Sequence, residues 1–322
     1  MIEKKSREYE IEDVFRTYGV LTREAGFYFY FSRKIRELRE SGHEGTARAY
    51  ASSLRSMQRY LGKKDFPFIK LSSRIISDYQ GKLLASGICD NTIGFYLHNI
   101  KALFRKGCRE MGLELPCPFR DISIKTKKTL KRSLDPVVIK TLSAIELEKD
   151  SPLSLARDIF MFSFYTRGMS FVDIALLKKR HVFPGEICYR RHKTDQLMRV
   201  GINKEISRIL ERYKNVPGEY IFPLFPAERD PYAGYRNAYH RIRYSLGKIS
   251  RVIGLEFPLR LHAARHSWAT IAKVNGASVH VIGECLGHTS EKTTRIYLKE
   301  LDHSALDAVN NQVADFILAV DD

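Results

Sequence analysis

The stretch LRLHAARHSWATIAKVNGASVHVIGECLGHTSEKTTRIY, residues 259–297, decides how this chain is interpreted. It places His262 and Arg265 three residues apart, His288 directly after a Leu-Gly pair, and Tyr297 nine residues after His288. A spacing of three keeps two side chains on one side of a helix, so His262 and Arg265 are expected to lie together. Gly287 is expected to end a helix in the left-handed conformation and thereby to direct the ring of His288.

Two upstream segments contribute further polar residues. The segment FYTRGMSFVDIALL, residues 164–177, contains Arg167, followed by Ser170 and Asp173 at the spacing of a capping box. We expect Ser170 and Asp173 to cap the next helix and to steady Arg167 rather than to contact a ligand. The runs EICYRRHK, residues 186–193, and LMRVGI, residues 197–202, predict a β-hairpin that carries Lys193 near its tip.

Helical periodicity dominates residues 22–112. Apolar residues recur there at intervals of three and four, which predicts four amphipathic helices and a compact helical domain. The four blocks are Phe27, Phe31, Ile35 and Leu38; Ala47, Tyr50, Leu54, Met57 and Leu61; Ile75, Ile76, Tyr79 and Leu83; and Ile93, Leu97, Ile100, Phe104 and Met111.

The pattern changes at residue 113. Residues 113–135 hold two prolines and a cluster of lysines without helical periodicity, so we interpret them as a basic domain linker. Residues 136–300 combine helical patterns with the hairpin and predict a mixed α/β domain. Residues 1–21 are expected to form an N-terminal tail, and residues 301–322 a C-terminal helix or tail.

The chain is strongly basic. It has 54 Lys and Arg against 37 Asp and Glu, a net charge of +17, so its surface attracts polyanions and nucleic acid is the leading partner. Rows of basic residues at helical spacing are expected to follow a phosphate backbone, although solvated helix faces would give the same pattern. The candidate DNA-binding residues are Arg48, Arg55, Arg59, Lys101, Arg105, Lys125, Lys127 and Lys128.

Other classes of protein are disfavoured. The five cysteines form no C-x-x-C pair, which argues against a zinc site or a disulfide framework, and we expect no metal and no cofactor. The N-terminus MIEKKSREYE has no apolar region of a signal peptide, and no run reaches the roughly 18 apolar residues that span a bilayer. A cytoplasmic protein is expected.

Taken in order, these segments resemble the tyrosine recombinase (phage-type integrase) family. In that family H-x-x-R opens a helix, L-G-H ends a later one, and T-x-x-Y supplies a nucleophile. The resemblance implies a mainly α fold with a small β-sheet: an N-terminal four-helix, SAM-like core-binding domain and a mixed α/β catalytic domain. More narrowly, the chain resembles integrases of Bacteroides-type mobile elements. It departs from the family where HAARH replaces the commoner H-D-L-R-H and so lacks an acidic residue.

The resemblance also implies roles for six residues. Two arginines and a histidine would hold a DNA phosphate, a tyrosine would attack it, and a lysine and a second histidine would transfer protons, with the acid and base of each step left open. We expect His266, beside Arg265, to support the site by packing or hydrogen bonding. The implied catalytic residues are Arg167, Lys193, His262, Arg265, His288 and Tyr297.

The expected activity is site-specific recombination of double-stranded DNA at paired sites, through a 3′-phosphotyrosyl link and a Holliday junction. The resemblance implies a homo-tetramer on nucleoid DNA, a monomer or weak dimer when free, accessory DNA-bending proteins, and a C-terminal segment exchanged between protomers. Two alternatives stay open on the sequence. One is DNA relaxation like that of a type IB topoisomerase, and the other is a catalytically silent DNA-binding regulator.

Overall fold

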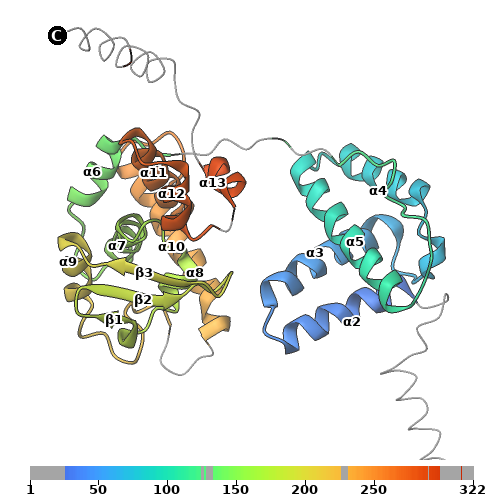
Figure 1. The fold of residues 1–322 in the computed structure, drawn as a ribbon, viewed down its shortest axis with the longest axis horizontal. Helices are drawn as coiled ribbons and strands as arrows, with labels where there is room; N and C mark the ends of the chain where they lie inside the picture. The colour runs from blue at the N-terminus through green and yellow to red at the C-terminus, as the bar shows by residue number, and fades with distance from the viewer. Residues whose placement is uncertain are drawn as a thin grey trace, which may run out of the picture. The chain divides into compact units, whose positions relative to one another are not determined.

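The chain folds into two compact units, Met1–Thr129 and Leu130–Asp322. The computed structural model describes residues 26–124, 127, 133–225, 231–288, 290–297 and 313, and only the backbone of residues 231–233, 296 and 297. The predicted N-terminal tail lies outside the described residues, as does the predicted segment 301–322 apart from residue 313. Both units are mainly helical, and the second contains a small sheet (Figure 1). This confirms the predicted fold class, while the predicted domain boundaries stay a prediction.

Four helices build the first unit, and each contains one of the four predicted apolar blocks. Their buried faces meet in one core, in which Phe27, Phe31, Leu97 and Ile100 are fully buried. The helix α3 packs against both α2 and α5. The bounds are α2 (Phe27–Glu40), α3 (Glu44–Leu61), α4 (Ser73–Ala85) and α5 (Asp90–Glu110), with the 3-10 turn η1 (Phe68–Lys70) before α4.

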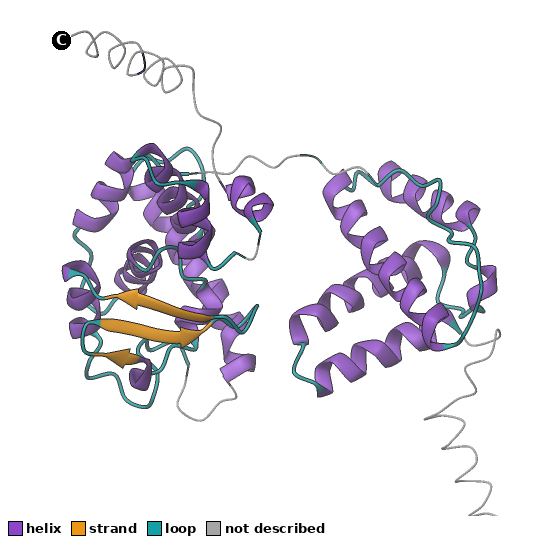
Figure 2. Cartoon of the chain, in the orientation of Figure 1, coloured by secondary structure: helices purple, strands orange, loops and turns teal. Residues whose placement is uncertain are grey.

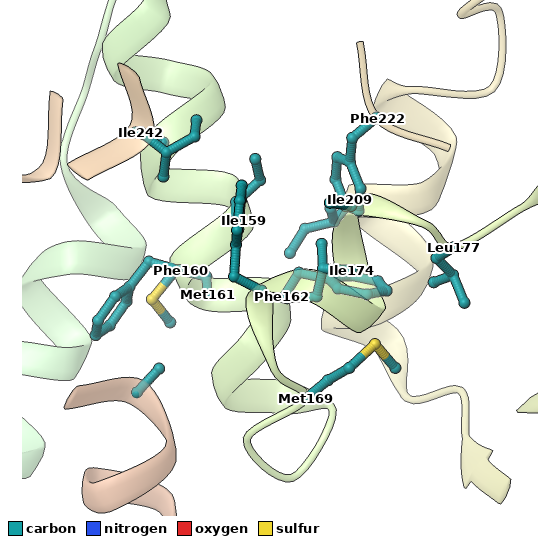
Figure 3. Close-up of a cluster of buried hydrophobic side chains, with 14 of the residues drawn as sticks. Ile159, Phe160, Met161, Phe162, Met169, Ile174, Leu177, Ile209, Phe222 and Ile242 are labelled. Carbon is teal, nitrogen blue, oxygen red and sulfur yellow. The ribbon is translucent and has the colours of Figure 1, made fainter. Parts of the chain in front are cut away.

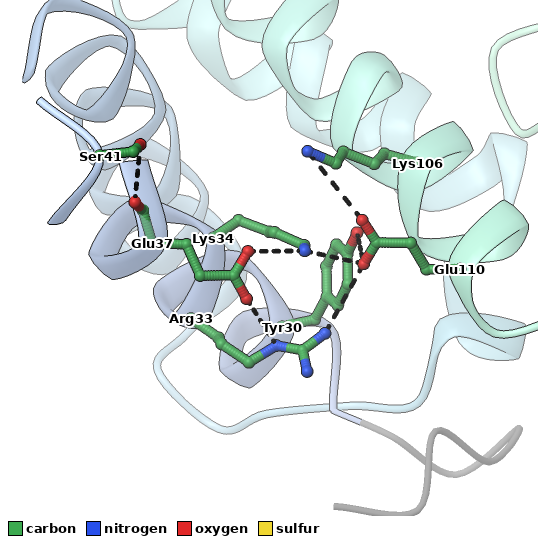
Figure 4. Close-up of polar contacts among 7 residues, drawn as sticks. All are labelled: Tyr30, Arg33, Lys34, Glu37, Ser41, Lys106 and Glu110. Atoms are coloured by element: carbon green, nitrogen blue, oxygen red, sulfur yellow. Dashed lines mark hydrogen bonds and ion pairs between the residues drawn. The ribbon is translucent and has the colours of Figure 1, made fainter. Parts of the chain in front are cut away.

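An ionic network joins α2 to the last turn of α5 (Figure 4). The Glu110 carboxylate accepts a hydrogen bond from Tyr30 Oη at 3.1 Å and lies 2.8 Å from Lys34 Nζ. Lys34 is only 8 % exposed and also pairs with Glu37 at 2.7 Å. Because a buried ammonium without a partner is costly, these carboxylates allow α2 to pack with its lysine inside.

The predicted linker is only partly free of the first unit. Over residues 113–124 it forms no helix, yet Phe119 is 2 % exposed within the first core. The apolar residues of this segment mostly alternate, as in extended chain, which explains why a search for helical periodicity does not find them. The others that pack against the core are Leu113, Leu115, Cys117, Ile122 and Ile124.

The second unit surrounds a buried helix, α7. Its neighbours include α6, α8, α9, α10 and α11, and α12 and α13 pack on α11. The unit also contains an antiparallel sheet in the order β1-β2-β3 (Figure 2). Within the described residues, no helix of either unit is long and apolar enough to span a membrane. The bounds are α6 (Pro136–Ala144), α7 (Pro152–Tyr165), α8 (Phe171–Ala175), η2 (Lys179–His181), β1 (Val182–Phe183), β2 (Glu186–Arg190), β3 (Leu197–Gly201), α9 (Lys204–Arg212), α10 (Pro231–Val252), α11 (Leu261–Val274), α12 (Val279–Leu286) and α13 (Glu291–Tyr297).

Figure 3 shows the core around α7. Four consecutive residues, 159–162, are all buried, so the helix is apolar on every side, which is the pattern of a helix enclosed by its neighbours. Met169 and Ile174 from the following segment, Ile209 from α9 and Ile242 from α10 complete this core. The predicted hairpin is confirmed: Ile187 pairs with Val200, and Tyr189 with Met198, so their side chains face the core.

Replacing Glu110 with Gln is expected to loosen the contact between α2 and α5. The substitution removes the charge that Tyr30 and Lys34 contact, and hydrogen bonds to charged groups contribute about 1.5–3 kcal/mol. Hydrogen exchange of the α2 and α5 amides in the full chain measures the loss locally. Glu44→Gln is the matched control, because its i,i+4 pair with Arg48 is of a kind that contributes about 0.3–0.5 kcal/mol. Equal effects of the two variants would contradict this role.

Candidate active site

Arg265 lies in the second turn of α11 and is only 5 % exposed. Its Nη1 donates to the carbonyl oxygen of Gly168 at 2.8 Å, and its Nη2 donates to that of Leu286 at 2.5 Å. A guanidinium removed from water needs such acceptors, because an unpaired buried charge costs several kcal/mol. Arg265 therefore holds the loop after α7 and the end of α12 against α11.

The loop after α7 carries Arg167 in an uncommon backbone conformation. Arg167 and Gly168 have φ of +59° and +75°, a left-handed pair that only glycine adopts without strain. A Cβ at Gly168 would lie 2.8 Å from Arg265 Cα, so the loop passes directly over α11. The Arg167 guanidinium is half-buried and faces the carbonyl oxygen of Arg199 on β3 at 3.5 Å. The two arginines are thus brought to one place by close backbone packing.

Ser170 and Asp173 hold the next segment, as the sequence predicts. Ser170 is the N-cap of α8, and its hydroxyl also donates to Asp173 Oδ2 at 2.6 Å. Asp173 is 5 % exposed, and its other oxygen accepts a hydrogen bond from the His192 backbone at 2.8 Å. Asp173 therefore attaches the hairpin loop beside Lys193 to the helix that follows Arg167. The contact between Asp173 and the His192 backbone was not part of the sequence-based prediction.

His288 contacts Arg265 on one side and α13 on the other. Gly287 ends α12 with φ +62° and ψ +45°, the predicted left-handed conformation. The Nε2 of His288 lies 3.0 Å from Arg265 Nη2, and its Nδ1 lies 3.0 Å from Thr294 Oγ1. Because a guanidinium only donates, Nε2 accepts and the ring proton resides on Nδ1. His288 is therefore neutral in this arrangement.

The surroundings of His288 favour the neutral ring. Burial, together with the positive charges of Arg265, Arg191 and Lys193, lowers the pKa of His288 to about 4. Burial also raises the pKa of Tyr189, which is near Asp173 and near the opposing charges of Arg191, Arg265 and Arg167. Arg191 from the hairpin and Arg265 from α11 thus act on both rings.

Two further predicted catalytic residues, Lys193 and His262, are exposed. Lys193 is exposed in the loop between β2 and β3. His262 is exposed in the first turn of α11, and its ring meets that of buried His266 edge to face, with centroids 4.7 Å apart. The supporting role expected for His266 stays a prediction.

Tyr297 is the last residue of α13, and its side chain lies outside the described residues. The helix itself is fixed by Thr294, which is fully buried and contacts His288. A Cβ at Gly283 would come within 3.0 Å of Thr294 Oγ1, so α13 packs closely on α12. The backbone that carries Tyr297 is therefore connected to the Arg265–His288 pair through one threonine.

The candidate DNA-binding residues of the first unit have varied surroundings. Arg55, Arg59 and Arg105 are exposed, whereas Lys101 is half-exposed and Arg48 pairs with Glu44 at 2.8 Å.

In the linker, Lys127 pairs with Asp90 at 2.9 Å, and its backbone N–H donates to Asn91 Oδ1 at 2.8 Å. Lys125 and Lys128 lie outside the described residues. Among the described residues no group of three or more His, Cys, Asp or Glu is arranged to hold a metal ion.

Two residues of the site received no role in the sequence analysis. Thr294 lies three positions before Tyr297, and Arg191 lies two positions before Lys193, so both stand inside segments that the analysis singled out. Arg191 Nη1 donates to the carbonyl oxygen of Gly287. The only sequence signal for either residue is this position beside a predicted catalytic group.

Gly168→Ala is expected to destabilise the second unit more than Gly185→Ala. Both glycines have positive φ, +75° and +82°, and an alanine in that region costs about 1–2 kcal/mol. Only at Gly168 does the new methyl group collide with Arg265, which adds about 1–3 kcal/mol. Urea unfolding followed by the fluorescence of Trp268, the single tryptophan, measures both variants. Equal losses would show that the loop does not depend on close packing over Arg265.

The stability of the second unit is expected to fall as the pH is lowered, because of His288. Its pKa is about 4 when folded and 6.5 as an ordinary histidine, so between these values the unfolded chain binds more protons. Stability therefore rises with pH across this window and is lost as pH falls from 6.5 towards 4. The difference in the free energy of unfolding between the wild type and His288→Gln should shrink as the pH falls from 6.5 towards 4. An advantage that is independent of pH would contradict a neutral His288.

Comparison with known proteins agrees with this architecture. Residues 133–303 match the model of the phage integrase family, and residues 26–120 match that of the phage integrase SAM-like domain. The tyrosine recombinase XerC of Shewanella oneidensis is 26 % identical over 67 % of this chain and 70 % of its own length. The tyrosine recombinase XerD of Pseudomonas putida is 24 % identical over 79 % of this chain and 86 % of its own length.

Two solved structures show the same fold. A lambda integrase dimer bound to a COC′ core site superposes with a TM-score of 0.64 at 17 % identity, covering 87 % of this chain and 97 % of that one. The Tn1549 transposon integrase in complex with transposon right end DNA also gives 0.64, at 15 % identity, covering 90 % of this chain and 100 % of that one. The match to the family model spans more than half of the chain, which therefore belongs to the phage integrase family and is a tyrosine recombinase.

Proposed function

We propose that this protein recombines double-stranded DNA at paired sites, using Tyr297 as its nucleophile. The observation that carries the proposal is the contact of Arg265 with His288 at 3.0 Å, to which the Arg167 loop and α13 are both attached. This arrangement brings cations from distant segments together, and we propose that they bind one DNA phosphate. The names and complexes of the relatives support DNA as the substrate.

The proposed reaction follows from the charge that a phosphodiester gains when it is attacked. Arg167 and Arg265 bring fixed positive charge to the non-bridging oxygens, where negative charge develops, and they act best when held before the substrate arrives. A tyrosine with the reference pKa near 10 is ionised at pH 7 in only about one molecule in a thousand. Nearby cations lower that value, and His262 accepts the phenolic proton as general base.

The cleavage step is a balanced exchange of bonds. Tyr297 Oη forms a bond to phosphorus, the bond from phosphorus to the 5′ oxygen breaks, and the Lys193 ammonium gives its proton to that oxygen. The products are a 3′-phosphotyrosyl link and a free 5′-hydroxyl, which attacks the link of a partner strand and leads through a Holliday junction. Since the covalent link conserves the bond energy, no ATP and no cofactor are needed.

His288 has a distinct part in this scheme. In the free protein its Nε2 accepts a hydrogen bond, which a phosphate oxygen cannot supply. A bound phosphate offsets the charges of Arg265, Arg191 and Lys193, and so raises the pKa of His288 towards its ordinary value. Once the phosphate is bound, the ring takes up a proton from water at Nε2 and donates a hydrogen bond to a phosphate oxygen.

We also propose how the protein contacts DNA and assembles on it. We expect the helical unit to contact DNA through Arg48, Arg55, Arg59, Lys101, Arg105, Lys125, Lys127 and Lys128. A lambda integrase tetramer bound to a Holliday junction has the same fold, with a TM-score of 0.62, and supports a tetramer on DNA for this chain. We further propose that residues 301–322 are exchanged between protomers and that accessory DNA-bending proteins take part. Off DNA the protein is a monomer or weak dimer, and it acts on nucleoid DNA in the cytoplasm. Topoisomerase-like relaxation and a silent regulator are not favoured, since the relatives are named as recombinases.

Covalent trapping tests the nucleophile. We expect wild-type protein expressed in its host to yield SDS-resistant DNA adducts, whose sequenced junctions identify the recombination sites. Tyr297→Phe should abolish the adduct because it lacks the attacking oxygen. Tyr244→Phe, at a tyrosine on α10 that is 64 % exposed, should leave it unchanged. An adduct that survives Tyr297→Phe would end the assignment.

A further inference from the structure

The loop that carries Lys193 is closed by the backbone of Arg191. The Arg191 N–H donates to the carbonyl oxygen of Gln196 at 2.9 Å, and its own carbonyl oxygen accepts from Asp195 N–H at 2.8 Å. Residues 192–195 therefore project from a closed base. On one side this loop is attached to α8, because Asp173 binds the His192 N–H.

The Arg191 side chain attaches the other side of the loop. Its half-buried guanidinium donates to the carbonyl oxygen of Gly287, the residue that directs His288. The hairpin also packs against this turn, since a Cβ at Gly287 would lie 2.9 Å from Met198 Sδ and 3.2 Å from Gln196 Oε1. The turn is fixed in its own right by the hydrogen bond from His288 N–H to the Gly283 carbonyl oxygen at 2.9 Å.

We propose that Arg191 is a positioning residue that couples the Lys193 loop to the His288 turn, and so sets where Lys193 meets the leaving oxygen. The inference rests on the proposed function, in which Lys193 protonates that oxygen. Lys193 itself is exposed on a loop, and without this link the loop would lose its attachment to the His288 turn and keep the one to Asp173. An arginine suits the task because its long side chain ends in a planar fork that binds a carbonyl oxygen in a defined direction.

The competing role for Arg191 is direct binding of the DNA phosphate, since it adds a positive charge beside His288. The two roles predict different chemical rescue. A residue that acts through Lys193 is needed only while the leaving oxygen must be protonated. A residue that binds the phosphate is needed whatever the leaving group is.

The experiment compares two leaving groups in single-turnover cleavage. The duplex recovered by covalent trapping is synthesised with either oxygen or sulfur at the bridging 5′ position of the scissile phosphate. A thiolate leaves without a proton, because thiols have a pKa near 8.5, whereas alcohols are far weaker acids. Arg191→Ala is expected to slow adduct formation on the oxygen substrate by about 10- to 100-fold, as misplacement of a reacting group does. On the sulfur substrate it should react within about threefold of the wild type.

Controls separate this inference from the proposed function. Lys193→Ala should show the same rescue, and Arg191→Lys, which keeps a donor and the charge, should recover part of the rate on oxygen. Arg199→Ala removes an exposed guanidinium of the same hairpin that pairs with Glu186 at 2.7 Å, and should leave both rates unchanged.

Each outcome decides one claim. A defect of Arg191→Ala that persists on sulfur, or no defect on oxygen, overturns the positioning role. Failure of the wild type to form an adduct on either substrate overturns the proposed function instead.

Discussion

The second unit depends on one buried charge, the guanidinium of Arg265. A cation that is 5 % exposed needs hydrogen-bond acceptors nearby, and here these are the Gly168 carbonyl, the Leu286 carbonyl and His288. The first acceptor belongs to the loop after α7 and the other two to the end of α12, so satisfying one side chain fixes both segments against α11. The requirement for glycine at 168 follows from the same contact, because the loop can reach Arg265 only if no Cβ stands between them.

The concentration of positive charge explains the polar groups around the site. Arg191 and Arg265 act on both the His288 ring and the Tyr189 ring, whereas Lys193 acts on His288 and Arg167 on Tyr189. Like charges at short range repel. The negative charge of Asp173 acts on Tyr189 against these cations. The two Asp173 oxygens accept hydrogen bonds from the Ser170 hydroxyl and from the His192 backbone N–H. A neutral His288 adds no further charge. In the proposed reaction, a DNA phosphate relieves this repulsion when it binds.

The sequence predicts those features that depend on neighbours along the chain. The four helices of the first unit follow from apolar periodicity, the α8 cap from Ser170 and Asp173, and the αL turn from Gly287, because each is a local pattern. The packing of residues 113–124 was missed since Phe119 and its neighbours mostly alternate instead of recurring at helical intervals. The contacts of Arg191 with Gly287 and of Thr294 with His288 join different elements, and spacing along the chain carries no information about which carbonyl or ring a side chain will meet. The side chain of Tyr297 lies outside the described residues, so its place in the site stays a prediction.

Burial divides the candidate catalytic residues into two kinds. Arg265 and, in part, Arg167 and His288 are enclosed, and they are the groups proposed to hold developing charge, which is stabilised most when the donors are fixed in advance and water is excluded. Lys193 and His262 are exposed, and they are the groups proposed to move protons. A group that gives up a proton in one half of the reaction must regain it before the next, and contact with water allows that exchange. The cost of leaving Lys193 exposed is a loss of orientation, which explains why the loop that carries it is attached to Asp173 on one side and to the His288 turn on the other.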